Sequence, residues 1–270
     1  MTPSTTAETS PTPCGSDLES VPVPASRPAW FAADLHLDGE EFARERFHHL
    51  LRLAHAEGAD LFLLGDVFHY WFGPKHLRLP MFQRELGLMR AMTHLGVAIT
   101  IVPGNRDFLL DGAFTRATGA EVSADAETIA VGSERIHLSH GDLFGLADRR
   151  YQRMRRVLHS APVRGLAARL PTAMVNALAR RLRQHSEVVV AKKSAEVLAP
   201  DLPTVRALIV EAGYDVVICG HFHEVRDELL EGEERCGRFR VLEPFEEHGY
   251  YLIRDSHGWS ERRLFVDEGA

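Results

Sequence analysis

The stretch that decides the fold is Leu61–Trp71, LFLLGDVFHYW, an apolar run that includes Gly65 and Asp66. A strand buried on both faces has a continuous hydrophobic sequence, and open α/β sheets bind ligands outside the carboxyl ends of such strands. We therefore expect Leu61–Gly65 to be a central strand whose end presents the Asp66 carboxylate to a ligand.

Four other predicted strand ends carry polar side chains beside a glycine or a turn. They are Asp34-Leu35-His36 after AWFAA, Gly104-Asn105-Arg106-Asp107 after VAITIVP, His140-Gly141-Asp142 after RIHLS, and Gly220-His221-Phe222-His223 after YDVVIC. Each block alone is weak evidence, because such residues commonly cap turns. Together their carboxylate, amide and imidazole groups suit divalent ions such as Mn, Fe or Zn. Seven ligands with one shared carboxylate would supply two sites of about four ligands each, as in two-metal hydrolases.

Length and composition favour one large soluble domain. The chain has 270 residues, of which 45% are hydrophobic and 26% charged, as in ordinary globular proteins. Its three cysteines do not form a disulfide framework, which indicates a reducing compartment. No run approaches the roughly 18 apolar residues of a membrane span. We expect a cytoplasmic protein.

The charge is unevenly distributed. The net charge is −7, yet twelve Arg and Lys residues lie between Arg149 and Lys193 against a single acid, Glu187. A basic block in an acidic protein indicates either an anionic partner or a solvated helical face. Charge alone leaves both interpretations open.

The chain is predicted to hold one folded domain, residues 29–270. Residues 1–28 contain six prolines and no apolar signal segment, which is typical of a disordered leader. Strands and helices then alternate, with a helical insertion or cap predicted over 146–198 and a long polar segment at Glu228–Arg238. The predicted helices of the scaffold are Glu41–Glu57, Leu77–Leu95, Leu109–Thr118 and Thr204–Ala212. The predicted strands after Leu61–Gly65 are Val97–Val102, Glu127–Val131, Arg135–Ser139, Val216–Cys219, Tyr250–Arg254 and Trp259–Phe265.

The five polar blocks resemble those of the calcineurin-like metallophosphoesterase superfamily, over Phe31 to Glu224. The resemblance implies an α/β fold, a four-layer α-β-β-α sandwich of two mixed sheets flanked by helices. It also implies two divalent metal ions. One would be held by Asp34, His36, Asp66 and His223, and the other by Asp66, Asn105, His140 and His221.

A narrower resemblance comes from the surrounding residues. Arg106 stands where most of the superfamily has His, Trp71 follows the Gly-Asp block, and the insertion follows His140-Gly141-Asp142. These features are similar to the UDP-2,3-diacylglucosamine pyrophosphatase family of lipid A biosynthesis, whose insertion clasps two acyl chains. The resemblance implies hydrolysis to UMP and 2,3-diacylglucosamine 1-phosphate, with Mn²⁺ as the first choice of metal. It implies catalytic roles for Asp66, Asn105, Arg106 and His221, and substrate contacts from Asn105, Arg106, Asp148, Ser186, Lys193 and His221.

Several positions depart from that family and leave the substrate open. They are Lys75, Val190 and Glu224. One alternative is a divergent metallophosphoesterase acting on another nucleotide-linked diphosphate or phosphodiester, including nuclease-type activity. A second is a non-catalytic scaffold of the same fold, although such proteins typically lose ligands and all seven are present here. Asp142 is open too, either as an acceptor that orients His140 or as a turn cap.

The expected partner is a nucleotide-linked glycolipid. Peripheral contact with the cytoplasmic face of an anionic inner membrane is a further expectation from the basic insertion. Neither a nucleic acid nor an obligate protein partner is expected.

Overall fold

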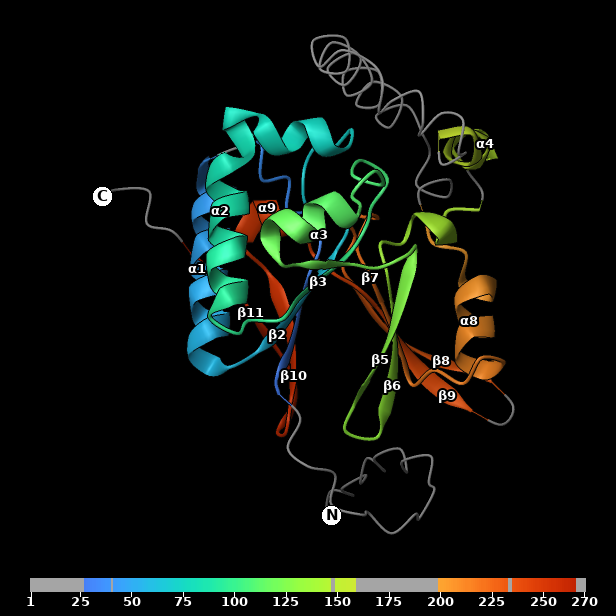
Figure 1. Cartoon of the computed structure of the whole chain (residues 1–270). Helices are drawn as coiled ribbons and strands as arrows, with labels where there is room; N and C mark the ends of the chain where they lie inside the picture. The colour runs from blue at the N-terminus through green and yellow to red at the C-terminus, as the bar shows by residue number, and fades with distance from the viewer. Residues whose placement is uncertain (1–26, 40, 147–148, 159–198, 233–234, 266–270) are drawn as a thin grey trace, which may run out of the picture.

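Two β-sheets pack face to face with helices on their outer sides (Figure 1). The computed structural model describes residues 27–39, 41–146, 149–158, 199–232 and 235–265. The predicted leader falls almost entirely outside these ranges, as does most of the predicted insertion. The predicted fold class, an α/β sandwich of two mixed sheets with flanking helices, is confirmed.

The first sheet is formed by both ends of the domain. Its strand order is β11-β10-β1-β2-β3-β4; β1 to β4 run parallel, and β10 pairs antiparallel with both β1 and β11. The bounds are β1 Ala29–Ala32, β2 Asp60–Leu64, β3 Ile99–Val102, β4 Glu121–Val122, β10 Tyr251–Asp255 and β11 Gly258–Arg262.

The second sheet is formed by the middle of the chain. Its order is β5-β6-β7-β9-β8, with β6, β7 and β9 parallel and the two edge strands antiparallel to their neighbours. The bounds are β5 Ala126–Val131, β6 Glu134–Ser139, β7 Val216–Cys219, β8 Arg226–Glu231 and β9 Cys236–Val241.

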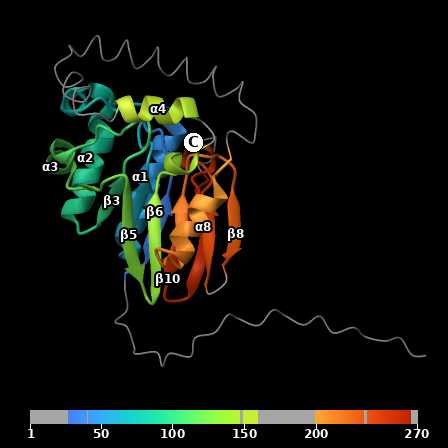
Figure 2. The same ribbon diagram turned by 90° about the vertical axis from the view of Figure 1, so that its right-hand side faces the viewer.

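Helices cover the outer face of each sheet (Figures 1 and 2). Helices α1, α2 and α3 lie on the first sheet and α8 on the second. The bounds are α1 Glu41–Glu57, α2 Pro80–His94, α3 Gly112–Thr118, α4 Arg149–Leu158, α8 Leu202–Val210 and α9 Phe245–His248, with 3₁₀ turns η1 Pro74–Arg78 and η2 Asp142–Phe144. No described helix is both long and apolar enough to cross a bilayer.

Side-chain alternation along β1 divides the core. Trp30 and Ala32 pack under the helices of the first sheet, whereas Phe31 and Ala33 pack between the two sheets. Successive side chains of a strand point to opposite faces, so a strand buried on both sides must be apolar throughout. This is why β1 and β2 appear in the sequence as continuous apolar runs.

One predicted helix is wrong, and one hairpin was not predicted. The predicted helix Leu77–Leu95 is divided into η1 and α2, because Leu79 is extended (φ −78°, ψ 131°) ahead of Pro80. The ring of a proline disfavours helical backbone at the preceding residue. The predicted polar segment Glu228–Arg238 contains most of the β8–β9 hairpin, with β8 at the edge of its sheet.

Candidate metal centre

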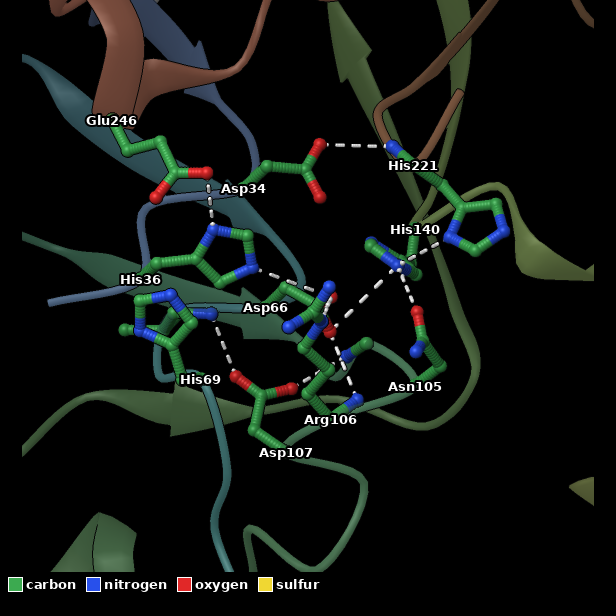
Figure 3. Close-up of polar contacts among 12 residues, drawn as sticks. Asp34, His36, Asp66, His69, Asn105, Arg106, Asp107, His140, His221 and Glu246 are labelled. Atoms are coloured by element: carbon green, nitrogen blue, oxygen red, sulfur yellow. Dashed lines mark hydrogen bonds and ion pairs between the residues drawn. The ribbon is translucent and has the colours of Figure 1, made fainter. Parts of the chain in front are cut away.

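Side chains that follow the carboxyl ends of strands from both sheets point toward one another (Figure 3). Asp34 follows β1, Asp66 follows β2, and His140 follows β6. One ligand atom from each of these three buried side chains lies within 4.8 Å of the others. Residues far apart in the chain are thus gathered into one cluster of potential metal ligands.

Asp66 lies at the centre of this cluster. Its Oδ2 is 3.6 Å from Nε2 of His36 and 3.1 Å from Nε of Arg106, and its Oδ1 is 3.7 Å from Nε2 of His140. The Arg106 backbone N–H also donates to Oδ1 at 2.9 Å. Burial acts to raise the pKa of Asp66, but the charges and hydrogen bonds of these neighbours hold it well below its usual range. Asp66 is therefore an ionised carboxylate.

His140 connects the two sheets. Its Nδ1 donates to the Leu64 carbonyl at 3.0 Å, and its Nε2 lies 2.9 Å from Oδ1 of Asn105 and 3.1 Å from Nδ1 of His221. Burial disfavours a charged ring, yet Asp66 and Asp34 raise the pKa of His140 to about 9. Burial and the neighbouring His140 lower the pKa of His221 to about 4.

Asp34 and His223 complete the set of predicted ligands. Oδ2 of Asp34 accepts a hydrogen bond from the His221 backbone N–H at 2.9 Å. Its buried Oδ1 has no hydrogen-bond partner among the described residues, and Nε2 of His223 lies 3.9 Å from it. His223 is the most open of the seven, with its side chain 42% exposed. All seven predicted ligands thus lie around one site, and their roles there remain predictions.

Unusual backbone geometry coincides with the predicted ligands. Among the described residues other than glycine, the left-handed region of φ is occupied only at predicted ligand positions. They are Asp34 (φ 54°), His36 (47°), Asp66 (50°), His221 (71°) and His223 (55°). This conformation costs roughly 1–2 kcal/mol per residue and is concentrated at functional sites. The chain sustains that cost where it turns these side chains toward one another.

The donor set fits divalent cations. Two buried carboxylates, imidazoles and an amide oxygen are ligands of the kind that borderline divalent ions accept. Within the part of the chain that the structure describes, Oδ1 of Asp34 is a buried acceptor without a donor, which is costly unless a cation satisfies it. Burial acts to lower the pKa of His36, but Asp66 and Glu246 raise it to about 10. Together with the raised pKa of His140, this indicates that the electrostatic potential of the site favours positive charge.

Three neighbouring residues were not predicted as part of the site. Nδ1 of His36 lies 2.8 Å from Oε1 of Glu246, and the His69 ring stacks on His36 with centroids 4.4 Å apart. Asp107 accepts from the backbone N–H groups of Val67 and Gly104, each at 2.7 Å, and so joins the β2 and β3 loops. Asp107 was visible in the Gly104–Asp107 block, but no sequence pattern connects Glu246 with His36.

Asp142 does not orient His140, because the Leu64 carbonyl takes the Nδ1 proton. The sequence left two roles open for Asp142, and its role as the acceptor that orients His140 is therefore wrong. Asp142 instead pairs through Oδ2 with Nε of Arg155 on α4 at 2.6 Å. The predicted substrate residues Asp148, Ser186 and Lys193, and the departure at Val190, lie outside the described residues.

A family model named calcineurin-like phosphoesterase matches residues 27–225. A UDP-2,3-diacylglucosamine hydrolase of Pseudomonas putida KT2440 is 33% identical over 84% of this chain and 95% of its own length. The enzyme of the same name from Aeromonas hydrophila is 34% identical over 83% of this chain and 92% of its own length. A solved archaeal phosphodiesterase is 14% identical, covers 88% of this chain and 99% of its own, and has a TM-score of 0.45. The chain belongs to the calcineurin-like phosphoesterase family and is a metal-dependent hydrolase.

Proposed function

We propose that the protein hydrolyses the pyrophosphate of UDP-2,3-diacylglucosamine to UMP and 2,3-diacylglucosamine 1-phosphate, a step of lipid A biosynthesis. The observation that carries the proposal is the ionised Asp66 at the centre of a nitrogen and oxygen donor set, with Arg106 beside it. Support also comes from the relatives of that name, which are about a third identical over nearly their whole length.

Two divalent ions are assigned to the seven ligands, with Asp66 shared. Asp34, His36 and His223 complete one set, and the other comprises the ligands on the His140 side. Mn²⁺ is the proposed metal, and Fe²⁺ and Zn²⁺ are the competitors to test, because the mixed donors suit all three. Such ions lower the pKa of a coordinated water and neutralise charge on phosphoryl oxygens.

Arg106 is assigned to the substrate phosphate. Its side chain is 28% exposed, so it reaches the surface while its Nε contacts Asp66. A guanidinium has five N–H donors in a rigid fork, so one contact with Asp66 leaves donors for an oxyanion. Its positive charge would stabilise the negative charge that develops as the phosphoanhydride breaks. His221 and Asn105, which flank His140, are assigned to the same reacting phosphate in addition to the metal.

The remaining substrate contacts are assigned to the basic part of the chain. Asp148, Ser186 and Lys193 would bind the sugar and nucleotide portions, and the predicted insertion would hold the acyl chains. A diacylated substrate resides in a membrane, so we place the protein in the cytoplasm with peripheral contact at the inner membrane. Flotation with anionic vesicles tests that contact, and protein that stays with the soluble fraction at low salt counts against it.

The deciding experiment compares the hydrolysis of UDP-2,3-diacylglucosamine with that of UDP-glucosamine. UMP release is measured in the presence of Mn²⁺ and in the presence of EDTA. We expect EDTA-sensitive turnover of the acylated compound alone. If neither compound is cleaved while bis(p-nitrophenyl) phosphate is hydrolysed by metal-loaded enzyme, the phosphoesterase assignment survives and the lipid A substrate is wrong. That outcome would favour another nucleotide-linked diphosphate or a phosphodiester as substrate.

A further inference from the structure

The short helix α9 is attached to the end of β1. Ala33 and Pro244 form a parallel β-bridge, and the Phe245 backbone N–H donates to the Ala33 carbonyl at 2.9 Å. The next residue, Glu246, donates its backbone N–H to the Asp34 carbonyl at 3.3 Å. Phe245 is fully buried in the core of the first sheet. These contacts place the first residues of α9 directly beside a predicted metal ligand.

Helix α1 holds the same turn from the other side. Nη1 of Arg46 donates to the carbonyl oxygens of Glu246 and Glu247 at 2.8 and 2.9 Å. Gly249 then ends α9 with a left-handed φ of 63°, and its N–H donates to the Phe245 carbonyl at 2.7 Å. The backbone of Glu246 is therefore fixed independently of its side chain.

The Glu246 side chain points toward His36, on the side of the metal centre where His69 also lies (Figure 3). Its Oε1 lies 2.8 Å from Nδ1 of His36, whose other ring nitrogen, Nε2, faces Asp66 Oδ2 at 3.6 Å. His69 stacks on the His36 ring at an interplanar angle of 22°. His36 is only 2% exposed, so its ring has little room to rotate.

We infer that Glu246 is a positioning residue for His36. By accepting the Nδ1 proton it would fix the tautomer and the plane of the ring, so that the Nε2 lone pair is directed at a cation bound beside Asp66. A carboxylate behind a ligating histidine acts in this way and makes the imidazole a stronger ligand. The inference rests on the proposed metal centre, and it gives α9 a part in a site to which no sequence pattern assigns it.

The structure offers a matched control in the next residue. Glu247 is on the same helix and is exposed, whereas Glu246 is partly buried, with 31% of its side chain accessible. Both residues hold Arg46 through backbone carbonyls, which side-chain substitutions leave in place. A substitution at 246 therefore removes or weakens the contact with His36, whereas one at 247 leaves it, and both leave the backbone contacts of α9 in place.

The test is Mn²⁺ binding to the metal-free full chain by calorimetry, comparing wild type with E246A, E246Q, E247A and E247Q. We expect E246A to weaken one class of sites about 10- to 100-fold, the range found when the partner of a ligating histidine is removed. E246Q should lose less, because its amide oxygen still accepts the Nδ1 proton. Both variants at 247 should match wild type, and the thermal midpoint in EDTA should stay unchanged in E246Q.

Three results would overturn the inference. The first is wild-type Mn²⁺ affinity in E246A. The second is an affinity loss in E246Q accompanied by a matching fall in the EDTA midpoint, which would make Glu246 a purely structural residue. The third is a wild type that binds three Mn²⁺ ions and an E246A variant that binds only two. The ligand atoms of Glu246, His36 and His69 lie within 4.8 Å of one another, so this result would mean that they form a separate metal site. A wild type that binds no metal would instead refute the proposed metal centre.

Discussion

Gly104 packs directly against the carboxylate of Asp66. A Cβ added at position 104 would lie 2.2 Å from Oδ1 and 2.4 Å from the backbone nitrogen of Asp66. Real Cβ atoms essentially never lie within 3.0 Å of another atom, and here one of the two atoms belongs to the backbone of the buried Asp66. The β3 loop must therefore carry a glycine where it crosses the β2 loop.

The first prediction is that Gly104→Ala displaces Asp66 and lowers hydrolysis at least about 100-fold, the cost of disturbing catalytic geometry by about 1 Å. Initial rates and bound metal should fall together. Gly87→Ala is the control, because Gly87 lies in α2 with no atom within 4 Å of an added Cβ. That variant should keep full activity and gain about 0.5–1 kcal/mol of stability from the better helix former. Normal turnover by Gly104→Ala would contradict the close contact.

Removal of the shared carboxylate should abolish both metal binding and activity. In Asp66→Ala the proposed ions lose their common ligand, and two cations face each other without a charge between them. Elemental analysis of purified protein should find little metal. Mn²⁺ should raise the unfolding temperature of wild type and leave that of the variant unchanged. A variant that retains more than a few per cent of wild-type turnover would refute the two-metal centre.

Arg106→Ala should separate catalysis from metal binding. The guanidinium is assigned to the phosphate, so its loss should reduce turnover by about 10²–10³, as for removal of one oxyanion donor. Metal content should stay near that of wild type, because the seven ligands do not include the Arg106 side chain. If metal is lost with the arginine, its contact with Asp66 is what organises the site and the assignment to substrate is wrong.

Asp107→Asn should destabilise the junction of the β2 and β3 loops. The two carboxylate oxygens accept from Val67 and Gly104, and an amide can accept only one of these bonds. The second N–H would face an amide N–H₂ group and stay unsatisfied, which costs about 1–3 kcal/mol. Urea unfolding in EDTA measures this loss. An unchanged free energy of unfolding would mean that the loops do not depend on this bridge.

His137 should make part of the stability depend on pH. This ring is in β6 beside Tyr214, with centroids 5.0 Å apart, and burial lowers its pKa from 6.5 to about 4. The unfolded chain therefore binds the proton first as pH falls, so the contribution of His137 is complete above pH 6.5 and is lost toward pH 4.

The measurement is urea unfolding in EDTA at pH 7 and pH 5, for wild type and His137→Phe. Between these pH values His137 alone should cost wild type about 2 kcal/mol, a loss that the phenylalanine variant does not share. The raised pKa values of His36 and His140 act in the opposite direction, but they are common to both proteins and cancel in the comparison. Equal losses in the two proteins would contradict the effect.

The sequence predicted the parts of the fold in which the burial pattern is periodic or continuous. Helix α1 occupies the predicted residues Glu41–Glu57 and β7 the predicted Val216–Cys219, because one has a clear apolar face and the other is buried on both sides. The edge strand β8 is mostly charged and buries only Leu230 while the adjacent Leu229 is exposed, so it lacks a comparable signal. The seven predicted ligands could be located because each strand end carries its own polar block, and their binding of metal stays a prediction.

Contacts that depend on folding of distant segments could not be predicted. Glu246 reaches His36 because Pro244 and Phe245 attach the chain to the end of β1, and nothing near Glu246 in the sequence indicates this. Similarly, the choice of the Leu64 carbonyl over Asp142 as the partner of His140 depends on how the two sheets are docked.

The order of strands along the chain has a consequence for assembly. The first sheet needs β10 and β11 from the carboxyl-terminal part, whereas the second is built from the segment between β4 and α9. Asp34 and the His221 backbone, which meet across the two sheets, are 187 residues apart. An ion held by Asp34 from the first sheet and by His223, two residues beyond His221, would act as a reversible cross-link, closing a loop larger than half the polypeptide. Metal occupancy would then mark the last stage of folding, and a chain arrested before β7 forms would remain unable to capture its ions.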